Sequence, residues 1–202
     1  MLAALTLSLQ IQQSSFDLLD GVSIEIAAHN SANAPQIVRF ARPAEYELEV
    51  LRGKTVIWTN AAPEPEATSY PVHKRKFIPG PSVIVVYIWN GVDSDGTTPG
   101  PGNYTIRARL LGIGETPEAS ATVHFGSLVP INALETLKTG DVVTIGGTLD
   151  ATKGILTDAG GSVVLGRRIL NAPVTPIAVR GYLLKRYDRT PIFIVQRWAP
   201  LS

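Results

Sequence analysis

The feature that most constrains this chain is a strict alternation of apolar and polar residues in several short segments. Every second position is apolar in Leu5–Gln12, Val22–Ile26, Glu45–Val50 and Tyr104–Leu110. Successive side chains of a strand point to opposite faces of a sheet. This two-residue period therefore predicts antiparallel strands with one face against a core and the other, the wet face, exposed to solvent. The glutamates of Glu45–Val50 are therefore expected on the wet face.

Other segments of the first half also have strand character. Four further strands are predicted at Ile37–Phe40, Lys54–Trp58, Val83–Trp89 and Ala121–Phe125. Short strands joined by Gly- and Pro-bearing turns over about 125 residues predict an immunoglobulin-like β-sandwich. The chain has no cysteine, so the cysteine pair of an antibody domain is missing and only the architecture is predicted.

The second half predicts a smaller β domain. Gly126–Gly140 is expected to form a linker and a short entry helix at the domain boundary. Five strands are predicted after it, at Asp141–Leu149, Gly154–Asp158, Ser162–Gly166, Ile177–Lys185 and Ile192–Trp198. The pair Gly146-Gly147 predicts a sharp bend, which a small barrel needs to close. We therefore expect an all-β chain with a sandwich over residues 1–126 and a small, OB-like barrel over residues 127–202.

Several motifs of the first half occur in an order that is typical of one family. These motifs are the turn Asn30–Pro35, Phe40, Glu45–Val50, Gly53–Trp58, Ile78-Pro79-Gly80, Trp89 and Pro101–Thr105. In order and spacing they resemble the BsuPI family of bacterial intracellular proteinase inhibitors. The resemblance implies an immunoglobulin-like fold over residues 1–126, a proteinase as partner and a cytoplasmic location. A place in the cell envelope is the alternative if a leader has been removed.

The sharpest local feature is a basic segment between prolines, Ser69–Pro81. Proline restricts the backbone, which lowers the entropy cost of docking into a cleft. We expect a partner-binding loop here, and the alternative is an exposed connection whose charges only keep it solvated. The predicted contact residues are Tyr70, His73, Lys74, Arg75, Lys76 and Phe77.

Two other kinds of site compete with this interpretation. The three histidines, His29, His73 and His124, would form a copper or zinc site of the superoxide dismutase type if the fold brought them together. In the second half, bases and aromatic residues interleave, as in proteins that bind single-stranded nucleic acid. Those residues are Tyr182, Lys185, Arg186, Tyr187, Arg189 and Arg197, with Trp198 beside them.

The charge distribution and the missing motifs exclude several classes of function. Residues 1–126 carry nine Lys and Arg against twelve Asp and Glu, and residues 127–202 carry nine against five, so only the second half is mildly basic. The linear signatures of hydrolases, zinc peptidases and nucleotide-binding loops are missing, and the longest apolar run is too short to span a membrane. The sequence predicts a non-enzymatic protein-binding module without a cofactor, as a proteinase inhibitor or a subunit of a bacterial assembly.

Overall fold

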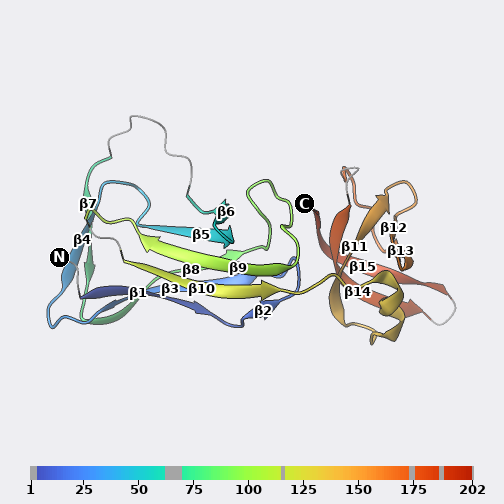
Figure 1. Cartoon of the computed structure of the whole chain (residues 1–202), viewed down its shortest axis with the longest axis horizontal. Coiled ribbons are helices and arrows are strands. Elements are labelled where there is room, and N and C mark those ends of the chain that lie inside the picture. The colour runs from blue at the N-terminus through green and yellow to red at the C-terminus, as the bar shows by residue number, and fades with distance from the viewer. Residues whose placement is uncertain (1–3, 62–69, 115–116, 173–175, 187–188, 202) are drawn as a thin grey trace. The chain divides into compact units, whose positions relative to one another are not determined.

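The computed structural model describes residues 4–61, 70–114, 117–172, 176–186 and 189–201. The chain divides into two compact units, each built from more than one segment (Figure 1). The first unit contains Met1–Ser14, Val22–Trp89 and Asn103–Val123, and the second contains Ser15–Gly21, Asn90–Gly102 and His124–Ser202. Both units are built from strands, so the predicted all-β class is confirmed.

The first unit is a sandwich of two antiparallel sheets. One sheet has the order β1 (Leu5–Ile11), β3 (Val22–Asn30) and β8 (Gly80–Trp89). The other has four antiparallel strands in the order β10 (Glu118–Phe125), β9 (Gly102–Leu110), β5 (Tyr46–Arg52) and β6 (Thr55–Thr59). The two-residue strand β2 (Ser15–Phe16) pairs in parallel with β10 at its edge. Seven of the eight strands predicted for this half of the chain lie in these two sheets, whose apolar faces share a core. The eighth, at Gln36–Phe40, lies in a separate two-stranded sheet.

The core of the sandwich joins the two sheets. The Trp89 ring of β8 lies 6.3 Å from the Tyr104 ring of β9, measured between centroids. Leu5 and Ala28 of the first sheet pack in one buried cluster with Leu110 of β9. Burial of such side chains stabilises the sandwich by about 1.5–3 kcal/mol each.

The expected wet face of β5 is more covered than the alternation indicates. Glu49 is only 7 % exposed, and its carboxylate is paired with the guanidinium of Arg107 on β9. Arg109 contacts both Glu47 and Glu49. Alternation assigns a side chain to one face of a sheet, but it does not show what covers that face.

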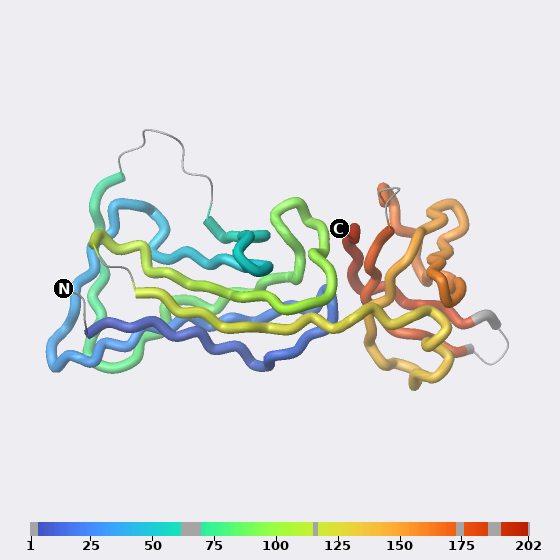
Figure 2. Tube along the Cα trace, in the orientation of Figure 1, coloured from blue at the N-terminus to red at the C-terminus, as the bar shows by residue number. Residues whose placement is uncertain are grey.

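A two-stranded ribbon lies beside the sandwich sheets, made of β4 (Gln36–Phe40) and β7 (His73–Phe77) (Figure 2). The expectation of a loop at residues 73–77 is therefore wrong. The pairing runs from Gln36 opposite Phe77 to Phe40 opposite His73. The segment becomes a strand because β4 supplies the backbone partner, which a local sequence pattern cannot reveal.

The second unit is a closed five-stranded barrel with the order β11-β12-β13-β15-β14. Its strands are β11 (Val142–Asp150), β12 (Ile155–Asp158), β13 (Gly161–Leu165), β14 (Ile177–Arg186) and β15 (Arg189–Pro200). The short 3-10 helix η1 (Ile131–Thr136) places Ile131 and Leu134 in the barrel core. The five predicted strands and the predicted entry helix are thus confirmed.

Two glycine positions explain how the barrel closes. A Cβ atom at Gly147 of β11 would lie 2.3 Å from the carbonyl oxygen of Thr157 on β12. A Cβ atom at Gly181 of β14 would lie 1.9 Å from the carbonyl oxygen of Ile194 on β15. Neighbouring strands approach so closely at these points that no side chain fits, as expected where a strand bends.

Two segments that separate sandwich strands in the sequence, Ser15–Gly21 and Asn90–Gly102, belong to the barrel unit. Residues 15–21 contain β2 (Ser15–Phe16), which pairs with the last two residues of β10. Leu19 packs against Ala178 and Ala199 of the barrel. Arg180 of β14 binds Asp17 at 3.2 Å and Asp20 at 2.5 Å. Within the described ranges, no helix is long and apolar enough to cross a membrane.

Candidate partner-binding surface

The β4–β7 ribbon has an inward and an outward face. Val38, Phe40 and Phe77 are buried on its inward face. The outward positions are all exposed, and they are occupied by Ile37, Arg39, Lys74 and Lys76. We call these four residues the basic face. Ile37 is 57 % exposed, so the basic face combines three cations with one exposed apolar side chain.

Like charges lie opposite each other on the basic face. Arg39 is the register partner of Lys74, and Ile37 is the register partner of Lys76. Directly opposed like charges destabilise an antiparallel pair. Among the described residues, none of these three cations has an acidic partner within ion-pair distance. The basic face therefore carries positive charge that neither of its strands neutralises.

Arg75 points the other way and has a structural partner. Its Nη1 atom lies 2.5 Å from Oε2 of Glu45, and the Nε2 atom of His73 lies 3.3 Å from Oε1 of the same carboxylate. The Arg75 guanidinium also lies over the Phe77 ring at 5.3 Å. Glu45 precedes β5, so this carboxylate ties β7 to the neighbouring sheet.

The six residues predicted to contact a partner thus separate into groups. Lys74 and Lys76 are exposed on the basic face. Arg75 and His73 are engaged by Glu45, and Tyr70 is half-buried. Phe77 is 1 % exposed and belongs to the core, so its expected role as a contact residue is wrong. The sequence did not single out Arg39 and Ile37, which join the basic face only through the pairing of β4 with β7.

The histidines do not form a metal site in the described part of the chain. No group of three His, Cys, Asp or Glu residues there is arranged to hold a metal ion. His29 and His124 are exposed on β3 and β10, while His73 stacks on Phe40 at 5.2 Å. The fold therefore gives His73 a role in packing and in the contact with Glu45.

The basic and aromatic residues predicted for a nucleic-acid surface on the barrel also fall into different environments. The Lys185 ammonium donates hydrogen bonds to the carbonyl oxygens of Glu135 and Leu137, at 2.8 and 2.9 Å, and so holds the end of η1. Trp198 packs against the barrel core, whereas Arg197 is exposed and Tyr182 is half-buried. Tyr187 lies outside the described residues, as do the side chains of Arg186 and Arg189.

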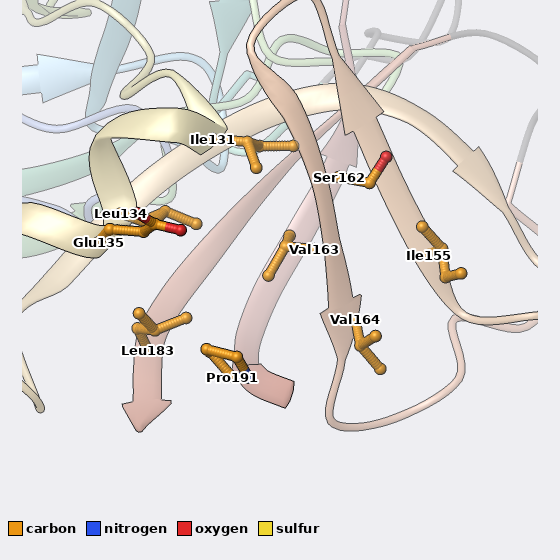
Figure 3. A pocket seen from close by; sticks show the side chains of 9 residues that line it. All are labelled: Ile131, Leu134, Glu135, Ile155, Ser162, Val163, Val164, Leu183 and Pro191. Atoms are coloured by element: carbon orange, nitrogen blue, oxygen red, sulfur yellow. The ribbon is translucent and has the colours of Figure 1, made fainter. Parts of the chain in front are cut away.

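The barrel carries an apolar pocket of about 400 Å³. Figure 3 shows η1 on one side of it and strands β12 and β13 on the other. Its lining consists of Ile131, Leu134, Glu135, Ile155, Ser162, Val163, Val164, Leu183 and Pro191. The β13–β15 pairing begins only at Val164 and Ile192, and Pro191 has no N–H group to extend it.

The described lining of this pocket is mainly apolar. The polar side chains among the described lining residues are Glu135 and Ser162, and the Ser162 hydroxyl lies 2.8 Å from the Thr157 hydroxyl. Among the described residues, the lining contains no imidazole, and Glu135 is its one carboxylate.

The fold and surfaces define an all-β protein with a sandwich unit and a barrel unit. No family model and no curated protein matches the chain. It is similar to a solved β-glucosidase, EmGH1 from Erythrobacter marinus, with 14 % identity, a TM-score of 0.33 and coverage of 59 % of this chain. The matched part is 15 % of that glucosidase chain.

A second solved structure is similar over more of the chain. It is Spo0M, a sporulation control protein from Bacillus subtilis, with 9 % identity and a TM-score of 0.40. The match covers 92 % of this chain and 76 % of that one. Likenesses of this size assign no activity, so the BsuPI resemblance stays a prediction.

Proposed function

We propose that this chain is a non-enzymatic protein-binding module whose basic face docks an acidic partner. The observation that carries the proposal is the opposition of Arg39 and Lys74 on the outward side of the ribbon, with Lys76 beside them. A partner carboxylate would relieve the repulsion that the two strands impose on each other. Complementary charge of this kind raises association rates and selects partners.

The surroundings of the basic face support a docking role. Glu45 holds Arg75 and His73 on the inward side, so the strand that presents Lys74 and Lys76 is anchored. Ile37 adds an exposed apolar contact between the cations. A surface whose backbone is already ordered loses less entropy when it binds than a mobile loop does.

The experiment is a comparative affinity enrichment from the source cell. Wild type is compared with a ribbon variant, Lys74→Glu with Lys76→Glu, and with a charge-matched control, Lys54→Glu with Lys138→Glu. Lys54 and Lys138 are exposed residues outside the ribbon. We expect an acidic protein that wild type and control retain and the ribbon variant loses, with an affinity that falls as salt rises. Equal retention by all three proteins would refute the proposal.

The BsuPI resemblance makes a proteinase one candidate for this partner. If the enriched partner is a proteinase, the purified chain should inhibit it stoichiometrically and remain uncleaved. The same ribbon variant should then raise the inhibition constant, because electrostatic attraction to the enzyme is reversed. If the partner is not a proteinase, the chain is a subunit of another assembly.

A further inference from the structure

Strand β8 is an edge strand with an unusual outward face. Within the described residues it pairs with β3 on one side only. Its outward residues Val83, Val86 and Ile88 are 55, 58 and 60 % exposed. These side chains lie on the solvent side of the sheet, where a protein normally places polar groups.

The same face of the same sheet is polar on the other two strands. In one row across the sheet, Gln10 of β1 is paired with Glu25 of β3, and Glu25 is paired with Val86 of β8. In the next outward row, Ser23 of β3 is paired with Ile88. The apolar surface is thus confined to β8, the strand whose other edge is open.

Between Val85 and Trp89 the open edge lacks the usual protection against pairing. The other end of β8 has such protection, namely Pro81, a pairing irregularity and a hydrogen bond at 3.4 Å from Nη2 of Arg75 to the Val83 carbonyl oxygen. Natural edge strands carry charges, prolines or bulges that block the addition of another strand. From Ser82 to Trp89 the chain has no proline and no Asp, Glu, Lys or Arg. An irregularity in the pairing with β3 falls between Ile26 and Ala27, so the half of β8 from Val85 to Trp89 is regular.

The edge of the second sheet adds apolar surface next to β8. The Trp58 ring of β6 lies 5.3 Å from the Tyr87 ring of β8, and both residues are half-buried. Val56 of β6 is exposed. Half-buried Trp and Tyr next to exposed aliphatic groups are typical of the central contacts of protein interfaces.

We propose that β8 pairs with β8 of a second copy of this chain, antiparallel about a two-fold axis at Tyr87. We favour a second copy as the occupant because the edge is uncharged from Ser82 to Trp89. A charged partner strand would find no opposite charge there, whereas another β8 brings no charge to the contact. A two-fold axis also makes the surface complementary to itself. Both copies contribute an uncharged edge with the same alternation of faces.

The register follows from which side chains point outward. An axis at Tyr87 places Val86 of each copy opposite Ile88 of the other copy. Outward apolar side chains therefore meet outward apolar side chains in two symmetric pairs. An axis at Val86 would instead oppose outward Val83 and buried Trp89, which lie on different faces. The two Glu25 carboxylates would be three strand spacings apart and offset by two residues along the strands, roughly 16 Å, where salt screens their repulsion.

The first test is the molecular mass in solution of three full-length proteins by sedimentation velocity. Wild type is compared with Val86→Lys and with Gln10→Lys. Both substitutions place a lysine in register with Glu25 of β3. Val86→Lys does so on β8, the proposed interface edge, and Gln10→Lys does so on β1, the opposite edge of the sheet. We expect wild type and Gln10→Lys at twice the 21.6 kDa of one chain and Val86→Lys at 21.6 kDa. A monomeric wild type, or a dimeric Val86→Lys, would overturn the proposal.

The second test reports the register and does not depend on the lysine variant folding. The chain has no cysteine, so a single introduced thiol can form a disulfide only with the same thiol of a second copy. At the proposed axis the Cβ atoms of the two residues 87 lie about 4.5–5.5 Å apart, close to disulfide distance. Tyr87→Cys should form a covalent dimer under mild oxidation and Ser82→Cys should not. Equal cross-linking of both variants, or of neither, would contradict this register.

Discussion

Glu49 and Arg107 face each other on neighbouring strands of the sandwich, 58 residues apart in sequence. The Arg107 Nε and Nη2 atoms donate to Oε2 of Glu49 at 2.8 and 2.6 Å. The Glu49 side chain is 10 % exposed and that of Arg107 is 33 % exposed. Removing one member of such a pair leaves the other charge partly buried without its partner, which costs more than the intact pair contributes.

We therefore expect Glu49→Gln to destabilise the sandwich by about 2–4 kcal/mol. Arg107→Gln should cost less, because the partly exposed arginine is partly solvated when its partner is lost. Urea unfolding of both single variants and the double variant gives the coupling energy, which should exceed about 0.5 kcal/mol. Additive effects of the two substitutions would show that the pair contributes nothing as a pair.

Tyr104 makes the stability of the sandwich sensitive to alkaline pH. Burial raises the pKa of its phenol above the ordinary value of 10.0, although the Arg52 guanidinium acts in the opposite direction. Because the pKa is raised in the folded state, the contribution of Tyr104 to stability is fully present below about pH 10 and is lost as pH rises from there through the folded pKa.

Tyr104→Phe should flatten this alkaline decline. The measurement is the midpoint of urea unfolding at several pH values from about 8 to about 11. This range includes the pH of about 10 near which an ordinary tyrosine ionises. Tyr46→Phe is a matched control on the neighbouring strand, and we expect it to retain the wild-type slope. If Tyr104→Phe declines as steeply as wild type, Tyr104 is not the group responsible.

The strand contact at Gly181 should tolerate no side chain. Gly181→Ala would place a methyl group against the Ile194 carbonyl, and moving the backbone aside is expected to cost about 3 kcal/mol, the upper end of the usual range for overpacking. Gly126→Ala is the matched control, since its nearest neighbour outside the adjacent residues is the Phe16 carbonyl oxygen at 3.8 Å. Thermal unfolding followed by circular dichroism separates the two, and an unaffected Gly181→Ala would mean that the strands can move apart at low cost.

Glu45 should control the order of the ribbon. Glu45→Gln removes the charge that Arg75 and His73 share, and the expected loss is about 1 kcal/mol because the groups are partly exposed. Hydrogen exchange of the His73–Phe77 amides should become faster while exchange of the barrel amides stays unchanged. Slower or unaltered exchange in the ribbon would show that packing alone orders β7.

Much of the fold was predictable because the strands are amphipathic. Alternation and turn residues predicted seven strands of the sandwich sheets, β4 of the ribbon and the five barrel strands. Gly147, one of the two glycines expected at a bend, lies where β11 closely approaches β12. Two elements escaped prediction. β2 is only two residues long, and β7 has the composition of an exposed connection, since four of its five residues are polar.

The candidate surface was predictable only in part. Local sequence singled out Lys74 and Lys76 as part of a basic run. It did not show that Arg75 turns inward to Glu45, that Phe77 enters the core, or that Arg39 joins the lysines from a strand more than 30 residues earlier. Strand pairing makes these assignments, because it places residues far apart in sequence on one face and separates neighbours onto two.

The sequence by itself determined the all-β class and most of the strands of this protein, since side-chain periodicity acts within each strand. Only the tertiary structure decided which charges meet and which side chains remain open. It paired Glu49 with Arg107, assigned residues 15–21 and 90–102 to the barrel unit, and left the apolar face of β8 at an edge. Those outcomes depend on contacts between distant segments, and the energy of such contacts is not encoded in any local pattern.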